Sequence, residues 1–361
     1  MNNARDKTRQ IRIGTLSLGG GSPVAVQSML NTRTADVTAC LNQIDALRCQ
    51  GCEIVRVAIP SSQHLAAFEQ ICALSPLPVV ADVHFDYRLA VAASVQGAAK
   101  LRINPGNIGG FDRLNAVLDA AHAADIPIRI GVNAGSLAPR YQDDRRLSLA
   151  EKLVASALEF TEHCALRGFE QLVLSVKAAS VPDTLAAYRS LSRELPEFPL
   201  HLGITEAGVS LAGTVKSAIG IGSLLEEGIG DTLRVSLTAS PLEEARVGWE
   251  ILSALELRQR HPYLISCPSC GRCEVDLIGI ATKVEQRLKE VQLPVTVAVM
   301  GCVVNGPGEA RRADVGVACG RGQGAIFKAG KVLYTVDESQ IVEALLSEIA
   351  SLSLAQTVEP N

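Results

Sequence analysis

The chain has 361 residues, of which 47% are apolar, so it is long enough for two globular domains or for one large barrel with an appended domain. Its formal net charge is only −4 and is spread along the chain, which argues against nucleic acid or a membrane surface as a partner and favours small molecules or proteins. The polar start MNNARDKTRQ and the lack of a long apolar run predict a cytoplasmic protein. Ten cysteines in that reducing compartment predict metal or redox chemistry rather than disulfides.

The first part of the chain repeats one pattern, in which a short β-branched apolar run is followed by a helical stretch. Ser148 and Glu151 form a predicted capping box, and Gly51 and Gly168 follow helical stretches as C-terminal caps. Eight such units predict an α/β fold. They favour a (β/α)8 TIM barrel rather than an open doubly wound sheet. The apolar runs are 24–29, 54–59, 77–85, 100–106, 126–133, 171–177, 199–206 and 231–237.

The pattern changes near residue 255, which predicts a barrel domain over 1–255 and a second domain over 256–361. The second domain begins with a cysteine-rich loop and continues with a predicted helix around 278–291. Three short strands are predicted after that loop, so this domain is also expected to be α/β. They are 295–300, 314–319 and 331–336.

Charged residues interrupt the predicted barrel strands near their C-terminal ends. These ends converge at one mouth of a barrel, where five cations would repel one another unless an anion such as a diphosphate binds between them. Asp82, Glu206 and His84 share that mouth and are candidate acids or bases. The alternative is that one or two of the charges form structural ion pairs. The five cations are Arg56, Arg102, Arg129, Lys177 and Arg234.

The cysteines of the second domain are spaced as metal ligands. Cys267, Cys270 and Cys273 have C-x2-C-x2-C spacing in a Pro/Gly loop, and Cys302 is placed to complete a four-thiolate site. This spacing leaves two centres open, an iron–sulfur cluster, which it favours, and a zinc ion.

Several longer stretches carry a family resemblance, among them LRINPGNIG, IPIRIGVNAGSL, LHLGITEAG, GIGDTLRVSL, CPSCGR and GCVVNGPGEA. In this order, from about residue 12 to 335, they resemble the 4-hydroxy-3-methylbut-2-enyl diphosphate synthase family. The resemblance implies a TIM barrel followed by a ferredoxin- or sulfite-reductase-like domain with a [4Fe–4S] cluster. It implies Cys267, Cys270, Cys302 and Glu309 as the cluster ligands and makes Cys273 a bystander, against the four-cysteine site suggested by spacing.

The resemblance also implies a reaction, the reductive ring opening and dehydration of 2-C-methyl-D-erythritol 2,4-cyclodiphosphate to (E)-4-hydroxy-3-methylbut-2-enyl diphosphate in isoprenoid biosynthesis. The five cations, Asn133 and Ser236 are then expected to bind the diphosphate. Glu206 is the expected proton donor, and Asp82 and His84 are expected to orient the substrate. Glu309 would be an exchangeable ligand that gives way to the substrate.

Partners follow from the same resemblance. Flavodoxin or ferredoxin is the expected electron donor, and a homodimer is expected in which the cluster domain of one chain closes over the barrel of the other. Two other readings remain open from the residues alone. One is a barrel lyase that forms a Schiff base on the amine of Lys177 and has a structural zinc site. The other is a non-catalytic module that binds phosphate ligands.

Overall fold

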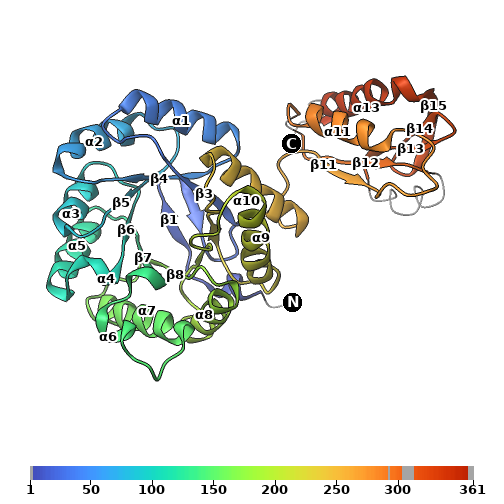
Figure 1. Ribbon diagram of the computed structural model, residues 1–361. Coiled ribbons are helices and arrows are strands. Elements are labelled where there is room, and N and C mark those ends of the chain that lie inside the picture. The colour runs from blue at the N-terminus through green and yellow to red at the C-terminus, as the bar shows by residue number, and fades with distance from the viewer. Residues whose placement is uncertain (1–2, 292, 303–312, 357–361) are drawn as a thin grey trace. The chain divides into compact units, whose positions relative to one another are not determined.

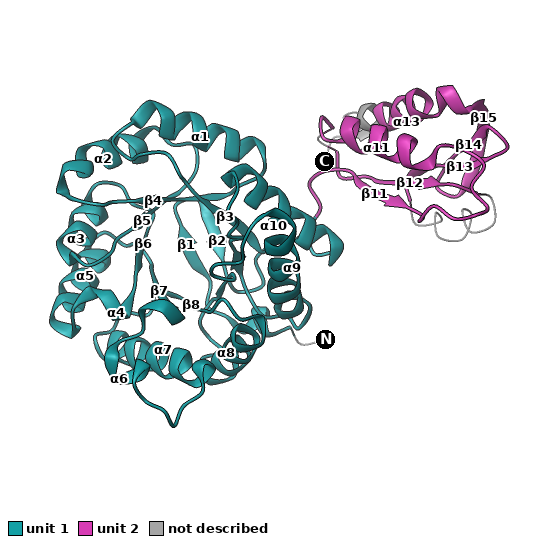
Figure 2. Cartoon of the chain, viewed as in Figure 1, with its two compact units in different colours: residues 1–258 teal, residues 259–361 magenta. Residues whose placement is uncertain are grey.

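The computed structural model describes residues 3–291, 293–302 and 313–356 (Figure 1). The chain divides into two compact units, residues 1–258 and residues 259–361 (Figure 2).

The first unit is a parallel eight-stranded barrel, which confirms the predicted fold. Seven neighbouring strand pairs run in parallel, and a parallel bridge between Leu174 and Leu200 joins the last strand of the order to the first. Each strand lies within one of the eight predicted apolar runs. The strands are β3 (Ala25–Met29), β4 (Ile54–Ala58), β5 (Val79–Asp82), β6 (Lys100–Ile103), β7 (Ile128–Asn133), β8 (Leu172–Lys177), β9 (His201–Leu202) and β10 (Thr232–Leu233).

Helices surround the barrel, as Figure 1 shows. The capping box of Ser148 and Glu151 is present at the start of α7, and Gly51 and Gly168 have positive φ values of 85° and 72° after α1 and α7. The helices are α1 (Val37–Cys49), α2 (Leu65–Leu74), α3 (Tyr87–Val95), α4 (Pro105–Ile108), α5 (Phe111–Ala123), α6 (Pro139–Gln142), α7 (Leu149–Leu166), α8 (Val181–Glu194), α9 (Ser210–Glu226) and α10 (Pro241–Ala254).

A hairpin closes the amino end of the barrel. It consists of β1 (Ile11–Ile13) and β2 (Leu16–Leu18), which pair antiparallel. Its buried side chains form one cluster with inward-facing residues at the starts of the barrel strands. This apolar floor leaves the carboxyl ends of the strands as the place for a site. The floor consists of Ile11, Ile13, Leu18, Ala25, Ile54, Val80 and Val173.

The second unit is a five-stranded sheet with two helices on one face (Figure 1). The first three strands in the order run parallel to one another. The fourth strand runs antiparallel to both of its neighbours, the third and the fifth. Apolar residues of both helices and of the sheet form one core, so the predicted second α/β domain is confirmed. The elements are β11 (Tyr263–Ser266), α11 (Leu277–Leu288), β12 (Thr296–Met300), β13 (Val315–Gly320), β14 (Gln323–Lys328), β15 (Lys331–Asp337) and α13 (Ile341–Gln356).

Candidate active site at the carboxyl end of the barrel

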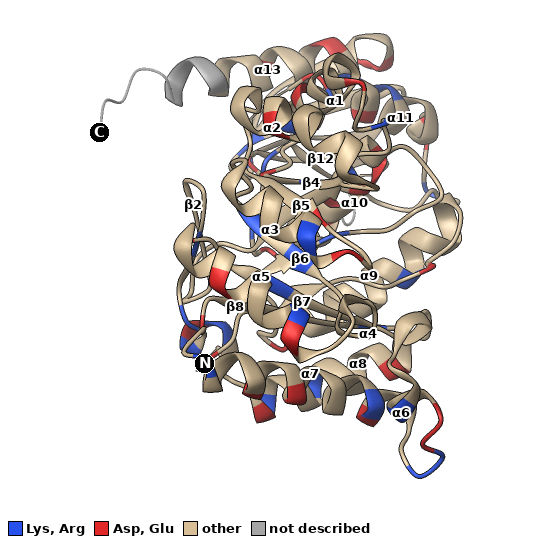
Figure 3. Cartoon of the chain, turned by 90° about the vertical axis from the view of Figure 1, so that its left-hand side faces the viewer, with Lys and Arg blue, Asp and Glu red and all other residues tan. Residues whose placement is uncertain are grey.

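The predicted cations lie inside the barrel, but not all of them are at the carboxyl ends of their strands as expected, since Arg129 is the second residue of β7 and Arg56 is the middle residue of β4. Val55 and Val57 pack in the cluster that faces the helices, so Arg56 between them points into the barrel. Figure 3 shows basic residues on the neighbouring strands β6 and β7, which carry Arg102 and Arg129. Arg56, Arg102, Arg129 and Lys177 are 9%, 4%, 2% and 6% exposed. In all four strands the alternate residues belong to the cluster that faces the helices, so the structure places these four guanidinium and ammonium groups on the inward face.

Asp82 joins three of the predicted site residues at the end of β5. Its Oδ1 lies 3.1 Å from Arg102 Nη1, and its Oδ2 lies 3.8 Å from Arg56 Nε and 3.5 Å from His84 Nε2. Burial alone would raise the pKa of Asp82, but Arg56, His84 and Arg102 together hold it well below its usual range. Asp82 is therefore ionised at neutral pH, and it can orient cations but cannot donate a proton.

His84 accepts a hydrogen bond from Arg102. Arg102 Nη1 lies 2.6 Å from His84 Nε2, and a guanidinium group can only donate. His84 Nδ1 lies 3.4 Å from Asn107 Nδ2, so the ring lies between the side chains of Arg102 and Asn107. Because the His84 side chain is 39% exposed, a molecule in the barrel mouth can reach it.

Arg234 belongs to a structural ion pair. Its Nη2 lies 2.9 Å from Glu244 Oε2 on α10, and its Nη1 donates to Ser236 Oγ at 2.8 Å. Glu244 also accepts a hydrogen bond from the backbone N–H of Leu237 at 3.0 Å. Arg234 is thus the cation to which the ion-pair alternative applies, and Ser236 is held beside it at the mouth.

Arg129 and Lys177 differ from the other cations because, among the described residues, no carboxylate forms an ion pair with either of them. Lys177 Nζ lies 3.5 Å from the carbonyl oxygen of Leu202. Burial, and then the charges of Arg129, Arg56 and other cations, lower the pKa of Lys177. Burial and neighbouring cations also lower the pKa of Arg129, but the intrinsic value for arginine is so high that its guanidinium stays protonated. These charges therefore favour binding of an anion.

Sequence reasoning missed three buried polar residues of this interior. Lys100 is fully buried and donates to Gln27 Oε1 at 3.4 Å, and neither ring nitrogen of His201 has a hydrogen-bond partner within the described chain. Glu244 is the third. Lys100 could have been found, since it lies two residues before Arg102 and so faces the same side of β6.

Glu206 and Asn133 complete the predicted residues of the mouth. Glu206 is exposed in the loop after β9, and its φ of 52° is uncommon for a residue other than glycine. Phe85, three residues after the end of β5, has a φ of 65°. Strained backbone of this kind is often found at functional sites. Asn133 ends β7 and is paired in register with Lys177 of β8.

Gly203 provides the space that Lys177 occupies. A Cβ at this position would lie 2.4 Å from Lys177 Nζ and 2.7 Å from the backbone oxygen of Arg234. We expect Gly203→Ala to displace the ammonium group and to weaken binding of an anionic substrate by about 10- to 100-fold. Isothermal titration of the substrate measures this. Gly222→Ala is the control, because its nearest neighbour would be 4.0 Å away, and equal affinity in both variants would contradict the prediction.

The predicted metal ligands lie in the second unit, where β11 and β12 end side by side. Cys267 follows β11 and Cys302 lies just after β12, and the N–H of Gly301 donates to Cys267 Sγ at 3.1 Å. Cys270 is exposed in the loop. Cys273 Sγ donates to the carbonyl oxygen of Val275 at 3.3 Å, and a Cβ at Gly301 would lie 2.9 Å from it. Parallel pairing of two strands therefore brings the sulfur atoms of Cys267 and Cys273 close to Gly301.

Glu309 lies outside the described residues. Within the described ranges, no three His, Cys, Asp or Glu side chains are already close enough together to hold a metal ion. The donor set itself fits an iron–sulfur centre, because it consists of soft thiolate ligands with a backbone N–H donor directed at one sulfur.

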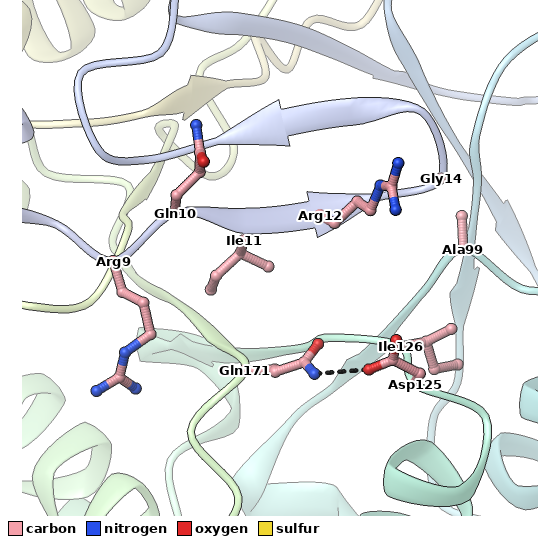
Figure 4. A pocket seen from close by; sticks show the side chains of 9 residues that line it. All are labelled: Arg9, Gln10, Ile11, Arg12, Gly14, Ala99, Asp125, Ile126 and Gln171. Atoms are coloured by element: carbon pink, nitrogen blue, oxygen red, sulfur yellow. Dashed lines mark hydrogen bonds between the residues drawn. The ribbon is translucent and has the colours of Figure 1, made fainter.

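A hollow of about 390 Å³ lies at the other end of the barrel (Figure 4). Ala99 and Gln171 in its wall immediately precede β6 and β8, so it opens at the amino ends of the strands. Arg9 and Arg12 also line it, and Gln171 Nε2 donates to Asp125 Oδ1 at 2.9 Å. None of the predicted site residues lies here, so the barrel mouth remains the candidate site.

Comparison with protein families gives two matches that together cover most of the chain. Residues 8–249 match the GcpE TIM-barrel domain, and residues 263–351 match the GcpE protein C-terminal domain. No helix in the described ranges is both long and apolar enough to cross a membrane.

Curated relatives carry the name 4-hydroxy-3-methylbut-2-en-1-yl diphosphate synthase (flavodoxin). The protein from Geobacter sulfurreducens is 51% identical over 346 residues, which cover 96% of this chain and 98% of the relative. The proteins from Lawsonia intracellularis and Salinispora arenicola are 50% and 51% identical and cover 96% and 97% of this chain and 97% and 90% of their own lengths.

Among solved structures, the dihydropteroate synthase of Yersinia pestis is similar to the barrel. It is 13% identical with a TM-score of 0.50, and the match covers 68% of this chain and 97% of that one. At this identity the likeness concerns the fold alone.

Proposed function

The chain belongs to the GcpE family of 4-hydroxy-3-methylbut-2-en-1-yl diphosphate synthases, and on that premise we propose how its residues carry out the reaction. It is an oxidoreductase of isoprenoid precursor synthesis. The substrate is 2-C-methyl-D-erythritol 2,4-cyclodiphosphate, and the product is (E)-4-hydroxy-3-methylbut-2-enyl diphosphate.

The observation that carries this proposal is the excess of buried cations inside the barrel. Arg129 and Lys177 have no carboxylate in an ion pair within the described residues, and they lie on neighbouring strands. A diphosphate supplies the missing negative charge and offers several oxygens to the guanidinium fork and to the ammonium group. Asn133 and Ser236 are at the same end of the barrel and bind the remaining oxygens. Arg56, Arg102 and Arg234 complete the proposed anion site.

Proton transfer is assigned to Glu206. Asp82 is ionised and tied to two arginines, so its role is to hold Arg56 and Arg102 in position. His84 takes its orientation from Arg102 and hydrogen-bonds to the substrate. Glu206 is exposed in the loop after β9, and within the described residues its side chain makes no hydrogen bond that would hold it away from the substrate, which suits a proton donor.

A [4Fe–4S] cluster is the proposed cofactor. Cys267, Cys270, Cys302 and Glu309 would hold it, with Cys273 beside it as a bystander. When bound, the cluster supplies the two electrons of the reduction, received one at a time from flavodoxin or, alternatively, from ferredoxin. We place the enzyme in the cytoplasm, where such donors are found.

A homodimer is proposed because α9 exposes an apolar stripe. Leu211, Val215 and Ile219 follow one another at intervals of four residues and are 79%, 48% and 52% exposed. We expect the double change Leu211→Glu and Val215→Glu to convert a dimer into a monomer, because burying two carboxylates is costly.

Sedimentation velocity measures this change in association. Val95→Glu is the control, since Val95 is 78% exposed but lies on α3, another helix of the barrel. A dimer that survives the double change would remove the α9 stripe from the interface.

Anaerobic reconstitution with iron and sulfide, followed by a turnover assay with reduced flavodoxin, tests the function as a whole. Formation of the diphosphate product in a brown preparation supports it. Trapping of a substrate on Lys177 by borohydride in a colourless protein would support the lyase instead. Tight binding of the cyclic diphosphate without turnover under a strong reductant would indicate a binding module.

A further inference from the structure

Two cysteine side chains of the second unit meet at one glycine. Cys267 Sγ accepts a hydrogen bond from the N–H of Gly301 at 3.1 Å, and a Cβ built on Gly301 would lie 2.9 Å from Cys273 Sγ. Both cysteines are half-buried and pack against the same apolar core of the sheet and its helices. The two sulfur atoms therefore lie against the same residue.

A third thiol lies beside this pair but is unsuited to oxidation. Cys319 on β13 is fully buried in the core against which both cysteines pack. Burial, and then the nearby Cys273, Glu338 and Cys267, raise the pKa of Cys319 to about 12. A buried thiol that stays protonated is inert. The effect of both cysteines on Cys319 indicates, independently of Gly301, that they lie near one point of the sheet.

The CxxC pair of Cys267 and Cys270 is the alternative partnership in this loop. Cys270 is exposed, and it is not among the described residues that pack against the core. Cys273 Sγ donates to the carbonyl oxygen of Val275 at 3.3 Å, so it carries its proton and is present as a thiol. The contacts of the sulfur atoms therefore favour Cys273 over Cys270 as the partner of Cys267.

We propose that Cys273 is a resolving thiol, which forms a reversible disulfide with Cys267 when the proposed cluster is lost. Hydrogen peroxide oxidises the Cys267 thiol to a sulfenic acid and leaves one water. The Cys273 thiol then attacks the sulfenic sulfur, so that the S–S bond forms, the S–O bond breaks, and the hydroxyl leaves as a second water with the thiol proton. Two thiols thus give two electrons to one peroxide. A small dithiol reduces the disulfide and restores both thiols.

The disulfide gives Cys273 a use that does not require it to bind iron. A sulfenic acid that meets no thiol is oxidised further to a sulfinic acid, which a dithiol does not reduce. A disulfide stops the oxidation of Cys267 at a stage from which the metal ligand can be recovered. The inference rests on the proposed cluster site only for this use of the disulfide.

Trypsin distinguishes the two possible disulfides, because Arg272 lies between Cys270 and Cys273. We expect the full chain, freed of iron and treated with hydrogen peroxide, to lose about two of its ten titratable thiols and to regain them with dithiothreitol. When the remaining thiols are blocked and the oxidised chain is digested, mass spectrometry should show peptides 261–272 and 273–283 joined by one disulfide.

Cys273→Ser should give no joined peptides and should leave Cys267 as a sulfinic acid. After peroxide and then dithiothreitol, reconstitution of this variant should restore at least about twofold less iron than reconstitution of the wild type. Cys72→Ser is the matched control, because Cys72 is also half-buried but lies on α2 of the first unit, and it should respond as the wild type does.

A disulfide between Cys267 and Cys270, which stays within peptide 261–272, overturns the proposal. Peroxide treatment that produces no disulfide also overturns it, as does an equal loss and recovery of thiols in Cys273→Ser and the wild type. The thiol and peptide measurements use neither iron nor substrate, so failure of the proposed reaction would leave them unaffected.

Discussion

Replacing Cys267 with serine is expected to remove the iron–sulfur centre and to lower turnover by at least about 100-fold, since even residues that only support metal ligands often cost that much. Cys267 receives the N–H of Gly301 on its sulfur, so it lies where the ends of β11 and β12 meet. Serine offers a harder and more weakly acidic donor that binds iron poorly. Iron and sulfide content, with absorbance near ~400 nm, measure the loss.

Cys273→Ser is the matched control for this experiment. Cys273 is close to Gly301 but donates its thiol hydrogen to Val275, so we expect the variant to keep its iron and its activity. Loss of the cluster from Cys273→Ser would restore the site of four cysteines that the spacing alone suggested.

Replacing Asp82 with asparagine is expected to lower the free energy of unfolding by about 3–5 kcal/mol and to weaken substrate binding. The change removes the negative charge that holds Arg56 and Arg102 inside the barrel, where both are at least nine-tenths buried. Urea denaturation measures the stability, and Glu159→Gln serves as a control, because that carboxylate pairs with Arg140 on the outer surface. A variant as stable as the wild type would contradict this role of Asp82.

The stability conferred by Asp82 should depend on pH in one direction. Its pKa is lower in the folded state than the value of about 3.9 in an unfolded chain, so its contribution is complete above about pH 4. As the pH falls further, toward the folded pKa, the contribution is lost. The difference between wild type and Asp82→Asn should therefore be constant near neutral pH and shrink in acid.

The barrel could be predicted because its strands are buried on both faces and carry long apolar runs. The runs at 199–206 and 231–237 were longer than the two-residue strands β9 and β10, since an apolar run marks burial rather than the extent of hydrogen bonding. Two strands of the second unit were missed, β11 before the cysteine-rich loop and β14, whose sequence QGAIFK begins with a polar residue and a glycine.

The inward face of the cations followed from the period of two along a strand, which is a local property. The ion-pair and hydrogen-bond partners of these buried residues did not follow from that local property. Glu244 reaches Arg234 from α10, and Lys100 crosses the interior to Gln27 on β3, which is not a neighbour of β6 in the sheet. Such pairs form between segments that are brought together only when the sheet closes into a barrel. The local sequence pattern does not predict which of these residues meet.

The hairpin of β1 and β2 limits the route by which small molecules can enter and leave the barrel. Because its side chains and those at the strand starts form one buried apolar cluster, the described residues close the amino end of the barrel and leave the carboxyl end for entry. Product must leave by the route through which substrate enters, and its diphosphate meets the same arginines on the way out. Product should therefore be a competitive inhibitor. When product accumulates, its binding at the carboxyl end of the barrel should limit the rate of turnover.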